Sequence, residues 1–235
     1  MTRFALLLPA AGLGARMGGR KTLLALAGKP ILRHTLERFA PFAARICQTI
    51  IVAHPADLPA IERECPGACV VAGGARRQDS VAAGLACVDP AAELVAIHDA
   101  VRPFVAPAAI AAALEAAERV GAAIVATPMK PTVKRVAGGL IAATVDRHGL
   151  WCAQTPQVFR RPLILEACAA AERDGAEVTD DAQLVERLGH PVAVVPGSDL
   201  NLKITTPEDL ALAEAILARG LAPTAGPSAT GFRGM

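Results

Sequence analysis

The sequence predicts an α/β protein built on a Rossmann-like, mostly parallel β-sheet. Three observations predict it: short apolar runs recur along the chain, stretches with helical spacing lie between them, and a Gly-rich loop directly follows the first run. Alternating strands and helices imply right-handed crossovers, and near-continuous apolar strands indicate a sheet covered on both faces. With 235 residues, 53% of them hydrophobic, the chain suffices for one large domain.

The first half of the chain supplies the alternating elements. Apolar runs that end in turns, glycines or polar residues predict strands, and the intervening stretches place apolar residues on one face of a helix. The expected strands are 4–8, 49–53, 69–72, 94–97 and 123–126, and the expected helices are 31–42, 80–88 and 108–120.

The alternation breaks after Pro128. Two strand-like segments, 132–135 and 140–145, flank the pair Gly138-Gly139, which is typical of a hairpin turn. We therefore predict a β-arm at about residues 130–155, inserted into the doubly wound domain. A helix at 162–174, a short helix at 179–188 and a strand at 192–195 are expected to follow it.

The last helix has clear end signals. Thr206 is its expected N-cap, Pro207 takes the first helical position, and Glu208 and Asp209 fall in the positive first turn. The helix is expected to end near Gly220. The sequence thus predicts a single domain over residues 1–220 and a disordered tail over 221–235, which is rich in small residues and proline.

Composition excludes several classes of function. Aromatic residues make up 3% of the chain and the net charge is +2, which argues against a nucleic-acid surface. The six cysteines form no C-x-x-C pair, so we expect reduced thiols and no zinc site. The apolar run before Pro9 is too short for a signal peptide or a membrane span, which favours a cytoplasmic protein.

The strongest local signal is the loop LPAAGLGARMGGRK at 8–21, directly after the first expected strand. Ligands of open α/β sheets bind at the carboxyl ends of the strands, and the N–H groups of such loops can hold phosphate oxygens. Met17 stands where the Rossmann fingerprint needs glycine, and the Walker A pattern is also absent. The loop alone leaves two interpretations: a phosphate site, or a tight turn with solvated cations.

Further motifs follow in order and make the chain resemble a known family. They are GGARRQDSV (73–81), HDAVRP (98–103), TVDR (144–147), TPQ (155–157), VTDD (178–181) and NLKIT (201–205). With the loop, they are similar to those of the methylerythritol-phosphate cytidylyltransferases, which use CTP in the non-mevalonate isoprenoid pathway and share the nucleotide-diphospho-sugar transferase fold. The resemblance covers about residues 4–218, with a short Met17–Lys21 spacer and Arg20 where the family usually has proline.

This resemblance implies a role for each motif around the nucleotide. The backbone of Ala10, Ala11, Gly12 and Gly14 would hold the cytosine and begin the phosphate loop. Gly74 and Ser80 would complete the base pocket, although the hydroxyl of Ser80 also suits an ordinary position near a helix N-terminus. The cations expected around the triphosphate are Arg16, Lys21 and Lys203.

The resemblance also implies the acceptor side of the site. Asp99, with Ala100 and Arg102, would face methylerythritol phosphate, and Asp99 is a candidate ligand of Mg²⁺. Arg102, three residues on, can pair with Asp99 and orient it. The acceptor phosphate would attack the α-phosphorus of CTP and pyrophosphate would leave. Because that phosphate is already anionic, no strong general base is needed, and His98 is interpreted as structural.

In the family the β-arm crosses to a second subunit. Thr132 and Arg147 would hold the acceptor phosphate there, with Lys134 on the same side of the strand as Thr132. The implied assembly is a homodimer with shared sites. A lone arginine on a hairpin is otherwise most often solvated.

Three alternatives remain at this point. A cytidylyltransferase for ribitol phosphate or another polyol phosphate shares the fold and differs in the acceptor pocket. A purine- or uridine-using sugar-1-phosphate transferase fits the short chain less well. A non-catalytic nucleotide-sensing module is the alternative of another class, and Arg16, Lys21, Asp99 and Lys203 argue against it.

Overall fold

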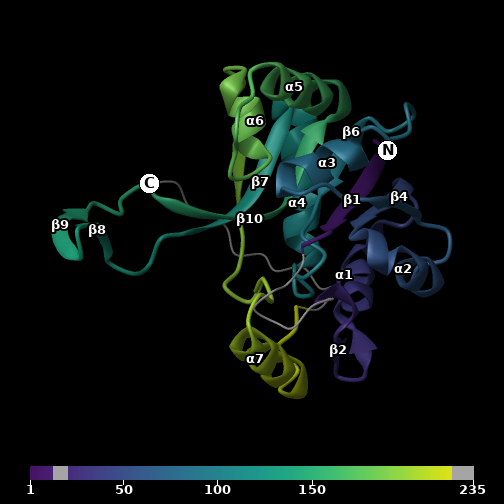
Figure 1. The fold of residues 1–235 in the computed structure, drawn as a ribbon, viewed down its shortest axis with the longest axis horizontal. Helices are drawn as coiled ribbons and strands as arrows, with labels where there is room; N and C mark the ends of the chain where they lie inside the picture. The colour runs from purple at the N-terminus through teal and green to yellow at the C-terminus, as the bar shows by residue number, and fades with distance from the viewer. Residues whose placement is uncertain (13–20, 224–235) are drawn as a thin grey trace.

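The computed structural model describes residues 1–12 and 21–223, and its centre is a seven-stranded β-sheet (Figure 1). The strand order is β11-β7-β10-β6-β1-β4-β5, and every pairing is parallel except those of β10 with β6 and β7. These strands are β1 (Phe4–Ala10), β4 (Ile46–Ala53), β5 (Cys69–Ala72), β6 (Leu94–Ile97), β7 (Ala122–Pro128), β10 (Trp151–Arg160) and β11 (Ala193–Pro196).

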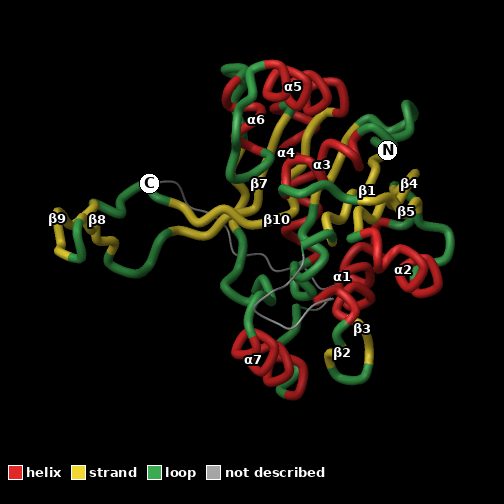
Figure 2. The backbone as a smooth tube through the Cα atoms, in the orientation of Figure 1, coloured by secondary structure: helices red, strands yellow, loops and turns green. Residues whose placement is uncertain are grey.

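Helices cover both faces of this sheet (Figure 2). They are α1 (Ile31–Phe39), α2 (Leu58–Glu64), α3 (Arg77–Leu85), α4 (Pro107–Val120), α5 (Arg161–Arg173) and α6 (Ala182–Arg187). The last helix, α7 (Pro207–Ala218), lies apart from the sheet, and its Ala213 and Ile216 pack in a cluster with Leu26 and Ile31. Short 3₁₀ turns lie at Lys21–Leu23, Ala40–Phe42 and Pro55–Asp57, and a small hairpin joins β2 (Ala25–Leu26) to β3 (Lys29–Pro30).

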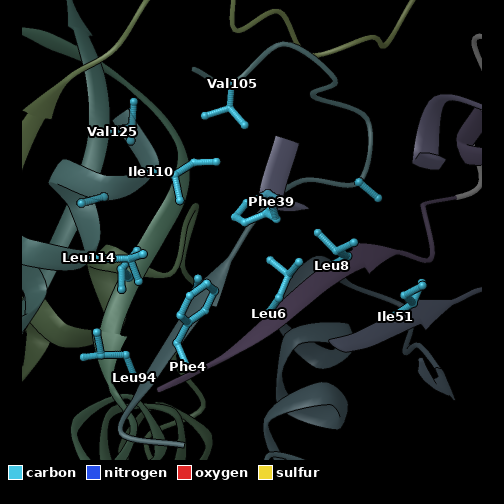
Figure 3. Packing of buried hydrophobic residues seen from close by; sticks show 14 of the residues in the cluster. Phe4, Leu6, Leu8, Phe39, Ile51, Leu94, Val105, Ile110, Leu114 and Val125 are labelled. Atoms are coloured by element: carbon cyan, nitrogen blue, oxygen red, sulfur yellow. The ribbon is translucent and has the colours of Figure 1, made fainter. Parts of the chain in front are cut away.

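The core follows from the alternation of side chains along the strands. Phe4, Leu6 and Leu8 of β1 face the layer formed by α1, α2 and α4 (Figure 3). Ala5 and Leu7 of the same strand face the opposite layer, formed by α3, α5 and α6. Both sets are essentially inaccessible to solvent, which explains why β1 is apolar without interruption.

The five strands expected in the first half of the chain are present, with slightly different bounds. The helix expected at 31–42 ends at Phe39 and continues as a 3₁₀ turn, because Pro41 has no N–H group and restricts the residue before it. The short helix expected from Thr179 begins at Ala182 instead, because Asp180 accepts a hydrogen bond from the backbone N–H of Gln183 and so lies ahead of the helix.

β10 is the element that the sequence did not reveal. It continues from the arm into the middle of the sheet, antiparallel to both neighbours, and its register with β7 shifts between Ala153 and Gln157. Gln154, Thr155 and Gln157 are buried polar residues, so the segment lacks the apolar run that identified the other strands.

The β-arm and the last helix agree with the sequence. β8 (Val133–Ala137) and β9 (Leu140–Val145) form an antiparallel hairpin that stands well away from the sheet (Figure 1). Thr206 caps α7, with Asp209 completing a capping box. Of the expected tail, residues 221–223 are described, and the carbonyl of Pro223 accepts a hydrogen bond from Arg38. Residues 224–235 lie outside the described residues.

Candidate active site

A cavity of about 560 Å³ opens beyond the carboxyl ends of β6, β1, β4 and β5, which are neighbours in the sheet. One or more residues at or after the end of each strand line the cavity, as expected for an open α/β sheet. The residues lining it are Pro9, Ala10, Ala11, Gly12, Lys21, Thr22, His54, Pro55, Gly73, Gly74, Ala75, Arg76, Arg77, Ser80, Asp99, Val101 and Lys203.

One wall is built by a close approach of backbone segments. A Cβ atom placed on Gly73 would lie 2.3 Å from the Cβ of Ala11 and 2.8 Å from Oγ of Ser80, so no side chain fits there. The hydroxyl of Ser80 accepts a hydrogen bond from the N–H of Gly74 at 3.2 Å and is held inside the turn. Ser80 therefore both belongs to α3 and fixes the Gly-Gly turn.

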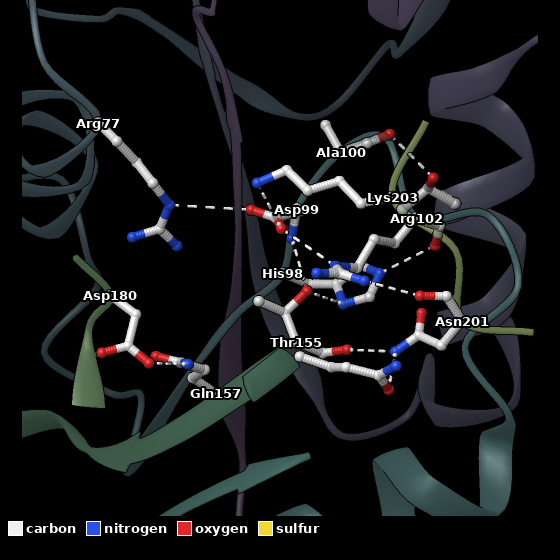
Figure 4. Close-up of polar contacts among 12 residues, drawn as sticks. Arg77, His98, Asp99, Ala100, Arg102, Thr155, Gln157, Asp180, Asn201 and Lys203 are labelled. Carbon is white, nitrogen blue, oxygen red and sulfur yellow. Dashed lines mark hydrogen bonds and ion pairs between the residues drawn. The ribbon is translucent and has the colours of Figure 1, made fainter. Parts of the chain in front are cut away.

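The opposite wall centres on Asp99, which is 5% exposed (Figure 4). Its Oδ2 lies 3.0 Å from Nζ of Lys203 and 3.1 Å from Nε of Arg102, and its Oδ1 lies 3.8 Å from Nε of Arg77. Burial alone would raise the pKa of Asp99, but the three cations hold that pKa well below its ordinary value. The carboxylate is therefore ionised at neutral pH.

A buried network fixes the backbone on which Asp99 stands (Figure 4). The N–H of Asp99 donates to Oγ1 of Thr155 at 3.0 Å, and that hydroxyl lies 3.0 Å from Nδ1 of His98. Nε2 of His98 bonds to the carbonyl of Arg102 at 3.1 Å, so Nε2 carries the proton and Thr155 donates to Nδ1. Burial lowers the pKa of His98 to about 4, so this ring is neutral at pH 7 and structural, as the sequence predicted.

Most of the predicted nucleotide and phosphate residues meet at the cavity. Ala10, Ala11, Gly12, Gly74, Ser80, Lys21 and Lys203 all line it, and so does Asp99, which was predicted on the acceptor side. Arg16 and Gly14 lie outside the described residues.

Two predicted acceptor residues stand behind the cavity rather than in its wall. Ala100 is fully buried, and its carbonyl accepts a hydrogen bond from Thr35 at 2.9 Å. Arg102 is committed to Asp99 and, through Nη1, to the carbonyl of Asn201 at 2.7 Å. Arg102 thus pairs with Asp99, as the spacing predicted.

Within this one chain, the arm residues are not part of the cavity. Thr132 and Arg147 are exposed and do not line it. Arg147 donates to the carbonyl of Lys130, and Lys134 donates to Thr144 at 2.6 Å.

Sequence reasoning missed several lining residues, above all Arg77. It lies inside the GGARRQDSV motif beside Arg76, which also lines the cavity, and the motif did not single out either arginine. Thr22 and His54 also line the cavity and carried no motif of their own. Only the pairing of distant segments reveals them.

The described part of the cavity combines cationic side chains, a tight glycine turn and one ionised carboxylate, Asp99. The buried His98 beside it is neutral and bonded on both nitrogens. Such a site works by positioning and charge stabilisation rather than by a nucleophile of its own. The fold and cavity thus define a member of the α/β nucleotidyltransferases.

Comparison with known proteins gives the family. The family model for IspD, 2-C-methyl-D-erythritol 4-phosphate cytidylyltransferase, matches residues 4–219. The enzyme of that name from Syntrophus aciditrophicus (strain SB) is 47% identical over 221 residues, spanning 90% of this chain and 94% of the relative. The chain belongs to the IspD family.

Solved structures agree with this assignment. The crystal structure of 2-C-methyl-D-erythritol 4-phosphate cytidylyltransferase from Thermus thermophilus has a TM-score of 0.80 and 40% identity, covering 93% of this chain and all of that one. The 4-diphosphocytidyl-2C-methyl-D-erythritol synthase from Anaerococcus prevotii has a TM-score of 0.81 and 32% identity, covering 93% and 99% of the two chains.

Proposed function

We propose that this protein transfers CMP from CTP to 2-C-methyl-D-erythritol 4-phosphate in the cytoplasm, releasing pyrophosphate and forming 4-diphosphocytidyl-2-C-methyl-D-erythritol. The observation that carries the proposal is the placement of Asp99 and Lys203 opposite the Gly73-Gly74 turn in one cavity. Membership of the IspD family supports both the nucleotide and the acceptor. The six free cysteines fit a reducing compartment.

The residues divide the work between holding the nucleotide and stabilising charge. The turn at Gly73 and Gly74, with Ala11 facing it, accommodates the base. Lys21 and Lys203 neutralise the triphosphate oxygens, which gain charge as the bond to pyrophosphate breaks. The acceptor phosphate is its own nucleophile, so no side chain has to remove a proton from it.

A divalent cation at this site would be bound by one protein carboxylate, that of Asp99, together with substrate phosphates. Asp99 is the only carboxylate among the described residues that line the cavity, and those residues contain no cluster of three or more His, Cys, Asp or Glu side chains. Mg²⁺ in nucleotide sites is bound by one or two carboxylates together with substrate phosphates. Asp99 would therefore hold Mg²⁺ jointly with substrate phosphates, and when bound the ion supplies charge neutralisation at those phosphates.

The acceptor half of the site is proposed to come from a second copy of the chain. The hairpin of β8 and β9 extends away from the sheet (Figure 1), and three of its apolar side chains are open to solvent. Val136 is 59% exposed, Leu140 is 76% exposed and Ile141 is 66% exposed. An apolar arm of this kind is suited to packing against a partner. Thr132 and Arg147 at its base would then reach the partner's cavity in a symmetric dimer.

The test is pyrophosphate release from CTP and Mg²⁺, with 2-C-methyl-D-erythritol 4-phosphate and ribitol 5-phosphate supplied separately. The proposal expects fast release with the first acceptor alone. Release with ribitol 5-phosphate alone would keep the chemistry and reject the acceptor. CTP binding without release in either mixture would favour a nucleotide-sensing module instead.

A further inference from the structure

Arg77 is a charged residue at the cavity for which the mechanism above has no use. It is the first residue of α3, its side chain is 31% exposed, and it lines the cavity (Figure 4). Its guanidinium makes two parallel hydrogen bonds to Asp181: Nη1 to Oδ1 at 2.8 Å and Nη2 to Oδ2 at 2.7 Å. The side chain of Asp181 is 1% exposed, so the pair is a bidentate ion pair whose carboxylate is buried and whose guanidinium is partly exposed.

Asp181 is itself held firmly from the sheet. Oε1 of Gln157, in β10, accepts hydrogen bonds from the backbone N–H groups of Asp181 and Ala182, at 3.0 and 2.9 Å. Nε2 of the same glutamine donates to Oδ2 of Asp180 at 2.8 Å. The turn before α6 is therefore fixed to the central sheet by hydrogen bonds. Because Arg77 is bonded to Asp181 in this turn, the position of its guanidinium is fixed as well.

The same guanidinium also approaches Asp99. Asp181 takes one N–H from each terminal nitrogen, and Nε lies 3.8 Å from Oδ1 of Asp99. Lys203 and Arg102 approach the other oxygen, Oδ2. The Asp99 carboxylate thus has cations from different segments on its two oxygens, and removing Arg77 would leave Oδ1 without its cation.

Charge supports the same conclusion. Burial alone would lower the pKa of Arg77, but attraction to Asp181 and Asp99 raises it above its ordinary value, so the guanidinium stays charged. Because Asp181 balances that charge, the pair adds little net charge to the cavity. Its contribution to the reaction is therefore geometric, and lysine cannot form the bidentate pair.

We propose that Arg77 is a positioning residue, held by Asp181, that fixes the orientation of the Asp99 carboxylate toward the acceptor. The inference rests on the proposed function, because the acceptor is the substrate of that reaction. Arg77 acts through Asp99, so its loss alters use of the acceptor while leaving the nucleotide pocket around Gly73 and Ala11 in place.

The experiment compares Arg77→Lys and Asp181→Asn with wild type by steady-state pyrophosphate release, varying CTP and 2-C-methyl-D-erythritol 4-phosphate in turn. Arg187→Lys is the matched control, because Arg187 pairs with Asp174 at 3.0 Å on the exposed surface. Circular dichroism melting of every variant checks that it is folded at the assay temperature.

We expect kcat/KM for the acceptor to fall about ten- to hundredfold in both variants, the size of effect for a lost charged hydrogen bond. KM for CTP should stay within about twofold, and Arg187→Lys should match wild type. The double variant should be no worse than the poorer single variant, because the two residues act as one unit.

Two results would overturn the inference. One is an acceptor kcat/KM within twofold of wild type in a folded Arg77→Lys protein. The other is a KM for CTP that rises as much as KM for the acceptor, which indicates general damage to the site. If the Arg77→Lys protein is unfolded, the inference is tested instead with Asp181→Asn, whose acceptor kcat/KM and KM for CTP are compared with wild type. An inactive wild-type protein would instead reject the proposed function.

Discussion

Replacing Gly73 with alanine should damage CTP binding. The new Cβ would lie 2.3 Å from the Cβ of Ala11, about 1.2 Å short of a normal carbon contact of roughly 3.5 Å. The Gly73 backbone cannot retreat easily, because its N–H donates to the carbonyl of Ala53 at 2.8 Å. The displacement therefore falls on Ala11 and Ser80, which form the proposed base pocket.

The magnitude follows from that displacement. A shift of about 1 Å in a catalytic constellation costs up to about a hundredfold in rate, and overpacking costs about 1–3 kcal/mol of folding free energy. We expect KM for CTP to rise at least about tenfold and kcat/KM to fall about a hundredfold in Gly73→Ala. Pyrophosphate release at varied CTP and saturating acceptor measures both.

Gly84→Ala is the control for the loss of stability. A Cβ there would lie 2.7 Å from Val52 and 2.8 Å from Leu7, so it overpacks the core behind α3, away from the cavity. It should lower the melting temperature by a similar amount and leave KM for CTP close to wild type. A Gly73→Ala protein with wild-type KM for CTP would refute the proposed position of the base.

Lys203→Ala should lower kcat about 10²–10³-fold, measured by pyrophosphate release, because a cation at the triphosphate is lost; an unchanged kcat would reject charge stabilisation by this lysine. Lowering the pH from about 6.5 to about 4 should reduce the free energy of unfolding by about 3 kcal/mol, because His98 stays neutral when folded and binds a proton when unfolded. Urea titrations across that range should find the loss abolished in His98→Gln. Leu140→Asp with Ile141→Asp should shift the protein to monomer in sedimentation, whereas a persisting dimer contradicts the arm proposal. Mixing Lys203→Ala with Arg147→Ala protomers should restore about a quarter of wild-type activity, because each mixed dimer keeps one intact shared site, and no recovery would place Arg147 in its own protomer's site.

The parallel strands could be predicted because burial on both faces requires an uninterrupted apolar run, as in β1. β10 could not, because its central residues are polar and buried. Gln154 donates to the carbonyl of Ser198, and Gln157 bonds to the turn before α6. These partners come from distant parts of the chain, so no local pattern identifies them.

In the candidate site, too, some residues could be predicted from local sequence motifs and others could not. Asp99 and Lys203 were found from motifs, and their 3.0 Å contact agrees with a common role. Arg77 was not singled out, because the motif that contains it gives no indication of its partner. Its partner Asp181 lies more than a hundred residues further along the chain, and only the fold brings the two together.

The central claim is that this chain joins CMP to one particular acceptor. The most direct measurement incubates the protein with CTP, Mg²⁺ and equal amounts of 2-C-methyl-D-erythritol 4-phosphate and ribitol 5-phosphate, and identifies the products by mass spectrometry. The account predicts 4-diphosphocytidyl-2-C-methyl-D-erythritol as the dominant product, formed far more slowly when Lys203→Ala replaces the wild type. CDP-ribitol as the main product, or unreacted CTP, would contradict it.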